Sequence, residues 1–246
     1  MAMLDDDILA HAARMAPAES CGFVIRTPMG ERYLPCKNRS LEPRRYFRMT
    51  PQDYLQASAR GELVALVHSH PHGDPYLSAA DRRLQIASAL PWWLVCEGRI
   101  ARYRPVPLLL GRPFVHGHAD CYALLRDAYH LAGIALPAMH YDADWYQQGA
   151  DLYLQELPRN GFSRIPLAAA QAGDVLLCCF GCSVANHAAI YCDDGQLLHH
   201  LPNQLSKREG YSERWQRQTH SLWRHHAWHA SAFTAICNDL AAATLC

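Results

Sequence analysis

Three residues that could bind one metal ion lie close together in the first half of the chain: His68, His70 and Asp81. The two histidines are two positions apart, so both imidazoles project to the same side of an extended segment. Asp81 falls in the first turn of the next predicted helix, where its carboxylate can complete three ligands. Zn²⁺ with three protein ligands keeps a fourth position open for a water molecule, whose pKa falls to about 7. The pattern predicts one catalytic zinc ion.

Glu19 and Ser78 could supply the other groups that hydrolysis at such a site requires. Glu19 lies between the first predicted helix and the first predicted strand, and we expect it to act as the general base. Ser78, beside the metal, is expected to donate a hydrogen bond to the developing oxyanion. The same Ser78-x-x-Asp81 pattern predicts a helix N-cap with an acid three residues later, and the two interpretations are compatible.

A second group of residues, Cys121, His187 and His199, could perform covalent catalysis. Cys121 lies at a predicted helix start, where the helix dipole is expected to lower the pKa of the thiol. A predicted hairpin over residues 193–195 brings the two histidines to the same end of a sheet. One histidine would act as the base that deprotonates Cys121, and the other would orient that base. His200 points to the opposite strand face, and only the spacing from His187 favours His199 as the third residue.

Apolar periodicity predicts the elements that must position these residues. In the first part of the chain it predicts a mixed α/β arrangement. The expected helices cover residues 4–15, start at Thr50-Pro51 and cover residues 78–89, and the expected strands cover residues 21–25, 63–67, 92–96 and 100–103.

A second organisation begins beyond Pro105-Val106-Pro107, which interrupts any regular element. We therefore expect two domains, residues 1–107 and 108–246. In the second, a helix comes first and antiparallel strands follow, an order that predicts an α+β domain. The expected helix covers residues 121–132, and the expected strands cover residues 174–180, 187–192 and 196–200.

Composition excludes several classes of protein. The 246 residues carry 23 basic and 23 acidic side chains, which gives no indication of a nucleic acid partner. Apolar runs are shorter than the roughly 18 residues of a membrane span. The acidic run at residues 5–7 is the reverse of a secretory n-region, so we expect the chain to start in a cytoplasm. The ten cysteines, scattered through predicted core strands, are interpreted as reduced thiols.

Glu19, the run His68-Ser69-His70-Pro71, Ser78 and Asp81 together resemble the motif of the JAMM (MPN-type) zinc isopeptidases. The resemblance covers residues 1 to about 105 and leaves no catalytic position unfilled. It implies a cytidine-deaminase-like α/β domain with zinc held by His68, His70 and Asp81. It also implies a water activated by Glu19 and hydrolysis of an amide or isopeptide bond.

Residues 111–117, Asp120-Cys121, residues 172–174 and residues 186–191 closely resemble the NlpC/P60 cysteine peptidases. This resemblance implies a papain-like α+β domain that cleaves peptides of bacterial peptidoglycan. Cys121 would be the nucleophile, His187 the base and His199 the third polar residue.

Two positions depart from the NlpC/P60 pattern. Tyr122 follows the nucleophile where members often have serine, and we expect it to narrow the space beside the thiol. Phe114 stands where an aromatic residue with a hydroxyl is common, so a contact to the tetrahedral intermediate is expected to be missing.

A JAMM domain joined to an NlpC/P60 domain resembles the tail assembly proteins of lambda-like bacteriophages. The resemblance implies work with other phage tail tip proteins, in the host cytoplasm during assembly and at the virion tail tip. Peptidoglycan stem peptides or a protein partner would be the substrate. Two alternatives stay open: a processing protease for a tail or ubiquitin-like protein, and a structural assembly factor with a residual cysteine site.

Overall fold

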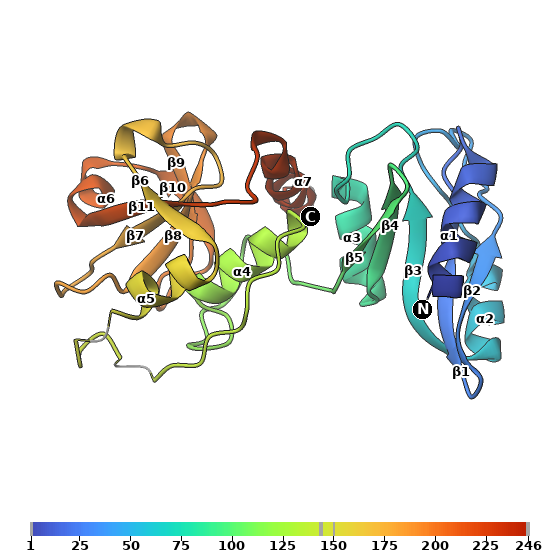
Figure 1. Ribbon diagram of the computed structural model, residues 1–246, viewed down its shortest axis with the longest axis horizontal. Helices are drawn as coiled ribbons and strands as arrows, with labels where there is room; N and C mark the ends of the chain where they lie inside the picture. Colours follow the sequence, from blue (N-terminus) through green and yellow to red (C-terminus); the bar gives the residue numbers. More distant parts are fainter. Residues whose placement is uncertain (1, 143–144, 150, 245–246) are drawn as a thin grey trace. The chain divides into compact units, whose positions relative to one another are not determined.

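The computed structural model describes residues 2–142, 145–149 and 151–244. The chain divides into two compact units, Met1–Val106 and Pro107–Cys246, each with its own sheet (Figure 1). None of the helices in the described ranges combines the length and the apolar character that a membrane crossing needs.

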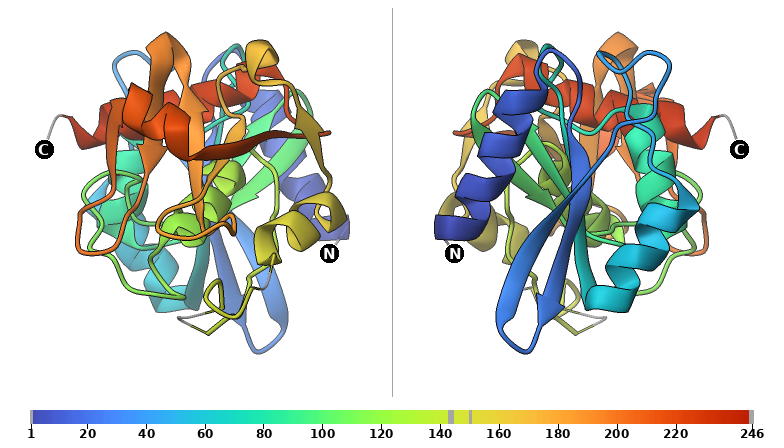
Figure 2. Two further views of the ribbon diagram at one scale, coloured as in Figure 1. Left: turned by 90° about the vertical axis from the view of Figure 1, so that its left-hand side faces the viewer. Right: turned by 90° about the vertical axis from the view of Figure 1, so that its right-hand side faces the viewer.

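The N-terminal unit is a sheet covered by helices on both faces (Figure 2). Ile8 of helix α1 (Ala2–Met15) packs with Val67 and Trp93 on one face, and Ala57 of helix α2 (Pro51–Arg60) packs with Leu66 on the other. The helices are α1 (Ala2–Met15), α2 (Pro51–Arg60) and α3 (Ala79–Ser88), and the strands are β1 (Cys21–Thr27), β2 (Gly30–Cys36), β3 (Glu62–Ser69), β4 (Trp92–Cys96) and β5 (Arg99–Tyr103).

Strand order in this sheet, β2-β1-β3-β4-β5, brings three distant segments to one edge. β1 and β3 are antiparallel with Cys21 opposite His68, so the start of β1 meets the end of β3. β3 and β4 are parallel, with His68 beside Leu94. Glu19, just before β1, and His70, just after β3, therefore lie at the same edge of the sheet.

The predicted helices and strands of this unit are confirmed, with ends that differ by a few residues. The start at Thr50-Pro51 is confirmed in detail: the Thr50 hydroxyl accepts the Asp53 amide and the Asp53 carboxylate accepts the Thr50 amide. Strand β2 was not predicted. It is an edge strand with mostly exposed residues, so it lacks the apolar alternation that identifies a half-buried strand.

The C-terminal unit begins with a helix and continues with antiparallel strands, which confirms the α+β prediction. The longer helices are α4 (Cys121–Leu131), α5 (Leu152–Arg159), α6 (Glu213–Gln218) and α7 (Phe233–Ala243). The strands are β6 (Phe162–Ile165), β7 (Val175–Cys178), β8 (His187–Cys192), β9 (Gln196–His199), β10 (Lys207–Gly210) and β11 (Thr219–His225). Their order in the sheet is β10-β9-β8-β7-β11-β6.

Candidate metal and thiol sites

Three potential ligand atoms form a small triangle at the sheet edge of the N-terminal unit. His68 Nε2 and His70 Nε2 are 3.1 Å apart, and they lie 3.4 Å and 3.3 Å from Asp81 Oδ2. Ligand atoms about 2.0–2.1 Å from a tetrahedral zinc lie roughly 3.3 Å from one another. The triangle therefore has the size of one face of such a tetrahedron. Among the residues that the structure describes, no other group of three or more His, Cys, Asp and Glu side chains brings its ligand atoms close enough together to hold a metal ion.

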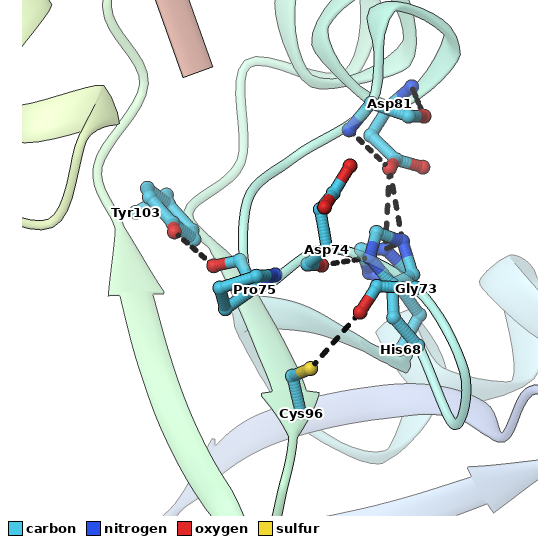
Figure 3. Close-up of polar contacts among 9 residues, drawn as sticks. His68, Gly73, Asp74, Pro75, Asp81, Cys96 and Tyr103 are labelled. Carbon is cyan, nitrogen blue, oxygen red and sulfur yellow. Dashed lines mark hydrogen bonds and ion pairs between the residues drawn. The ribbon is translucent and has the colours of Figure 1, made fainter. Parts of the chain in front are cut away.

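The loop from β3 to α3, whose residues Gly73, Asp74 and Pro75 are labelled in Figure 3, fixes the orientation of His70. His70 Nδ1 lies 2.9 Å from the Asp74 carbonyl, which directs Nε2 toward Asp81. The same loop is tied to the sheet, because Cys96 Sγ donates to the Gly73 carbonyl and the Tyr103 hydroxyl donates to the Pro75 carbonyl. These contacts hold His70 in place before any metal binds.

Asp81 belongs to the cap that starts α3. Its Oδ2 accepts the Ser78 amide at 2.8 Å, and the Ser78 hydroxyl accepts the Asp81 amide at 3.1 Å, which confirms the predicted N-cap. Burial raises the pKa of the Asp81 carboxyl, but His68 and His70 outweigh burial and lower that pKa below its usual range. Burial lowers the pKa of His68, which favours the neutral imidazole that metals bind. Asp81 and His68 thus already have the protonation states that a metal requires. Burial also lowers the pKa of His70, but hydrogen bonds to Asp81 and to the Asp74 carbonyl outweigh burial and raise that pKa, so a metal would displace a proton from His70.

Glu19 is held beside this triangle by its neighbours in the chain. The Ser20 amide donates to Ser69 Oγ at 2.8 Å, and the Ser69 amide donates to the Ser20 carbonyl at 3.1 Å. Ser69 lies between the two candidate ligands His68 and His70, so this pair of hydrogen bonds fixes the Glu19 backbone next to them. Burial raises the pKa of Glu19 to about 7; the Asp81 charge adds to the rise and His70 opposes it.

Replacing Glu19 with glutamine is expected to stabilise the metal-free chain in alkaline solution. The folded pKa of about 7 exceeds the unfolded value of 4.5, so the stability linked to this carboxyl is present below 4.5 and is lost as pH rises through 7. Glutamine avoids that loss, a gain of roughly 3 kcal/mol at about pH 8 and much less near pH 5. Urea unfolding of the parent chain and of Glu19→Gln, followed by hydrogen exchange in β1 and β3, gives the two free energies of unfolding. A difference between the two chains that is the same at both pH values would contradict the burial argument.

In the C-terminal unit, Asp120 caps the helix that begins with Cys121. Asp120 Oδ1 accepts the Ala123 amide at 3.0 Å, and Oδ2 accepts the Gly117 amide at 2.7 Å and the Tyr141 hydroxyl at 2.6 Å. Because these contacts fix the first turn of α4, they also fix the backbone of Cys121.

Cys121 and His187 both line a cavity of about 220 Å³. Tyr122 lies outside the described lining of this cavity, since its hydroxyl donates to the Pro137 carbonyl at 2.8 Å. Tyr122 was predicted to narrow the space beside the Cys121 thiol, but its hydroxyl is directed away from the cavity. Other aromatic residues line the cavity: Phe114, Tyr141, Trp145, Tyr146, Tyr153 and Phe180.

The prediction that the helix start lowers the pKa of the Cys121 thiol is wrong. Burial raises this pKa to about 11, and the neighbouring Asp120 charge adds to the rise. Hydrogen bonds from Tyr153 and from the amides of Ala188 and Tyr122 act in the opposite direction but do not compensate. Burial also lowers the pKa of His187 to about 3. Thiol and imidazole are both neutral at neutral pH, so the thiolate must form by proton transfer during attack.

His199, and not His200, is the histidine whose ring lies beside His187. The His187 and His199 ring centroids are 5.9 Å apart, whereas the His200 ring packs on Phe114 at 5.1 Å. His199 Nε2 is 3.3 Å from Glu209 Oε1 on the neighbouring strand β10, which pairs Lys207 with His199. Sequence reasoning missed Glu209, because its position depends on the pairing of a short polar edge strand.

Tyr153 was also missed, although its hydroxyl lies 3.2 Å from Cys121 Sγ. Both residues are buried. The phenyl ring of Phe114 has no hydroxyl, but the Tyr153 side chain of helix α5 places a hydroxyl beside the Cys121 sulfur. No pattern in the sequence connects this tyrosine with a cysteine 32 residues earlier.

Replacing Tyr153 with phenylalanine is expected to slow alkylation of Cys121 by iodoacetamide roughly tenfold or more at about pH 9, because a hydrogen bond to a charged group contributes about 1.5–3 kcal/mol. Mass spectrometry of the Cys121 peptide gives the rate. Tyr146→Phe is the matched control, since Tyr146 lines the same cavity. An unchanged or faster rate in Tyr153→Phe alone would show that the hydroxyl does not favour the thiolate.

Two family models match the chain, each within one unit. The model described as prokaryotic homologs of the JAB domain matches residues 2–106, and the NlpC/P60 family model matches residues 111–224. The JAB-type unit contains the triangle of His68, His70 and Asp81. The NlpC/P60-type unit contains the cavity with Cys121.

Two phage proteins are similar to this chain over most of its length. Tail tip assembly protein K of Escherichia phage lambda is 65% identical over 196 residues, which are 80% of this chain and 98% of the phage protein. The chain belongs to the tail tip assembly protein K family. The protein K of Escherichia phage N15 is 37% identical over 228 residues, 89% of this chain and 93% of its own length. Desampylase of Haloferax volcanii is 37% identical over 91 residues, 31% of this chain and 64% of that protein.

Proposed function

We propose that residues 1–107 form a zinc-dependent peptidase or isopeptidase domain. The triangle of His68 Nε2, His70 Nε2 and Asp81 Oδ2, with edges of 3.1–3.4 Å, carries this proposal. The match to JAB-domain homologs and the similarity to a desampylase support it. When bound, Zn²⁺ would polarise the substrate carbonyl and provide a water that is nucleophilic at neutral pH.

The residues around the triangle have distinct roles in this proposal. Glu19, with a pKa near 7, takes a proton from the nucleophile and returns it to the leaving nitrogen. The Ser78 hydroxyl already accepts the Asp81 amide, and its own proton is available to the developing oxyanion. The product pair is a carboxylate and an amine, from a peptide or an isopeptide bond.

Metal titration tests this site. The chain is stripped with a chelator and zinc is returned in competition with a chromogenic chelator; one equivalent is expected to bind. A folded chain that binds no zinc would overturn the proposal.

We further propose that residues 108–246 form a cysteine peptidase domain that cleaves peptidoglycan stem peptides. Cys121 Sγ attacks the carbonyl carbon while its proton passes to His187, which gives it to the leaving amine; water then hydrolyses the thioester. His199 orients His187. The shared cavity of Cys121 and His187 carries this assignment, and the NlpC/P60 match supports it.

The name of the phage relatives points to the setting of both activities. We propose that the chain takes part in assembly of a phage tail tip, with other tail tip proteins as partners. It would work in the host cytoplasm during assembly and at the virion tail tip when peptidoglycan is opened. A second candidate for the N-terminal unit is processing of a protein partner, which the likeness to a desampylase favours.

A further inference from the structure

Positive charge is concentrated in the loop between β2 and α2, residues 37–48. Five of the 23 Lys and Arg residues of the chain fall in this loop, against one acidic residue, Glu42. The formal net charge of the whole chain is zero, so the loop is a local exception. The five cations are Lys37, Arg39, Arg44, Arg45 and Arg48, and all five are exposed.

In the part of the chain that the structure describes, none of these five cations forms an ion pair with a carboxylate. Arg39 acts on the Asp53 carboxylate only at longer range, and the Arg45 guanidinium lies 5.7 Å from the centre of the Tyr46 ring. Exposed charges of one sign repel one another and attract a ligand of the opposite sign. The guanidinium groups are therefore available to carboxylates from another molecule.

Asn38 holds the backbone of this loop in place. Its Nδ2 donates to the Tyr46 carbonyl at 3.1 Å, and its Oδ1 accepts the Arg48 amide at 3.1 Å. The Arg39 amide donates to the Arg48 carbonyl at 2.9 Å, which closes the base of the loop. Because the backbone is already fixed, a partner would order mainly the arginine side chains, and the entropic cost of docking is reduced.

The loop also borders the metal site. Asn38 Nδ2 donates to the Glu19 carbonyl at 3.0 Å, and the Glu19 amide donates to the Pro43 carbonyl at 2.7 Å. The Phe47 ring packs on the ring of the ligand His68, with centroids 4.9 Å apart. A chain bound on the loop would therefore have its neighbouring residues beside Glu19 and the triangle.

Two apolar side chains among the cations favour a protein partner over a nucleic acid. Leu41 is 97% exposed and Tyr46 is 48% exposed. Arginine and tyrosine are enriched in protein–protein interfaces, where they contribute most of the binding energy. An exposed leucine can pack on another protein but has no counterpart on a phosphate backbone.

We propose that the loop 37–48 docks an acidic segment of a protein and so delivers the adjoining chain of that protein to the metal site. The inference rests on the proposed function of the N-terminal unit and names its class of substrate. Planar guanidinium groups would bind aspartate and glutamate carboxylates through paired hydrogen bonds. Leu41 and Tyr46 would pack against apolar residues of the same segment.

Binding without turnover tests this proposal separately from hydrolysis. The zinc-loaded full chain carrying Glu19→Gln is titrated into a short fluorescein-labelled peptide of alternating Glu and Gly, and anisotropy is recorded at low and high salt. The loop variant reverses three charges, Arg44→Glu, Arg45→Glu and Arg48→Glu. The matched control reverses three exposed charges of the same unit outside the loop, Arg32→Glu, Arg60→Glu and Arg99→Glu.

We expect the loop variant to weaken binding at least about tenfold, the control to change it by less than about threefold, and salt to weaken binding to the parent chain. Circular dichroism confirms that each variant is folded. The proposal is overturned if the loop variant and the control bind alike, if a Lys-Gly peptide binds as well, or if duplex DNA binds more tightly than the acidic peptide. Failure of hydrolysis alone would affect only the proposed activity.

Discussion

Replacing His68 with alanine is expected to weaken zinc binding by at least about 100-fold, because even the hydrogen-bond partners of metal ligands contribute about 10–100-fold to affinity. His68 is fully buried, and its Nε2 is one corner of the ligand triangle, 3.1 Å from His70 Nε2 and 3.4 Å from Asp81 Oδ2. The remaining imidazole and carboxylate cannot close a three-ligand site. Competition with a chromogenic chelator gives the affinity of each variant.

His72→Ala provides the matched control for this prediction. His72 is exposed and lies outside the triangle, although it continues the alternation of histidines at positions 68 and 70. We expect its zinc affinity to equal that of the parent chain. Equal losses in His68→Ala and His72→Ala would mean that zinc is held elsewhere.

The second large effect is expected at the thiol. Cys121→Ala and His187→Ala should each lower hydrolysis of soluble stem peptides by about 10³-fold or more, and the double variant should lose no more than Cys121→Ala alone. The effects do not add because nucleophile and base act in one step. Chromatography of the products gives the rates. Cys237→Ala, at an exposed cysteine of α7, should retain full activity.

The two adjacent histidines of the same unit can be distinguished in that assay. His199→Ala should lower the rate more than His200→Ala, since the His199 ring lies beside His187 and the His200 ring packs on Phe114. The reverse order would assign the orienting role to His200.

Much of the metal site could be predicted from the sequence because local rules determine it. Alternation along a strand places His68 and His70 on one side, and a capping pattern places Asp81 in a first helical turn. Both rules act over a few residues. The position of Glu19 depends in addition on the register between β1 and β3, which the sequence does not state.

The thiol site was harder to predict because its properties depend on tertiary packing. The helix start favours a low pKa for Cys121, yet burial under α5 and the strands reverses the sign. Tyr153 comes from the short helix α5 and Glu209 from the short, polar edge strand β10, so no local pattern connects them with Cys121 or His199. The basic loop was missed for a different reason, since the net charge of zero conceals an uneven distribution.

The two proposed domains act on different bonds, the thiol site on peptidoglycan stem peptides, and digestion of intact peptidoglycan tests this division most directly. Purified chain, Cys121→Ala and Glu19→Gln are each incubated with peptidoglycan, and released fragments are identified by mass spectrometry. We predict stem-peptide fragments from the parent chain and from Glu19→Gln, and none from Cys121→Ala. Fragments that persist with Cys121→Ala and disappear with Glu19→Gln would contradict the account, because cell-wall cleavage would then belong to the metal site.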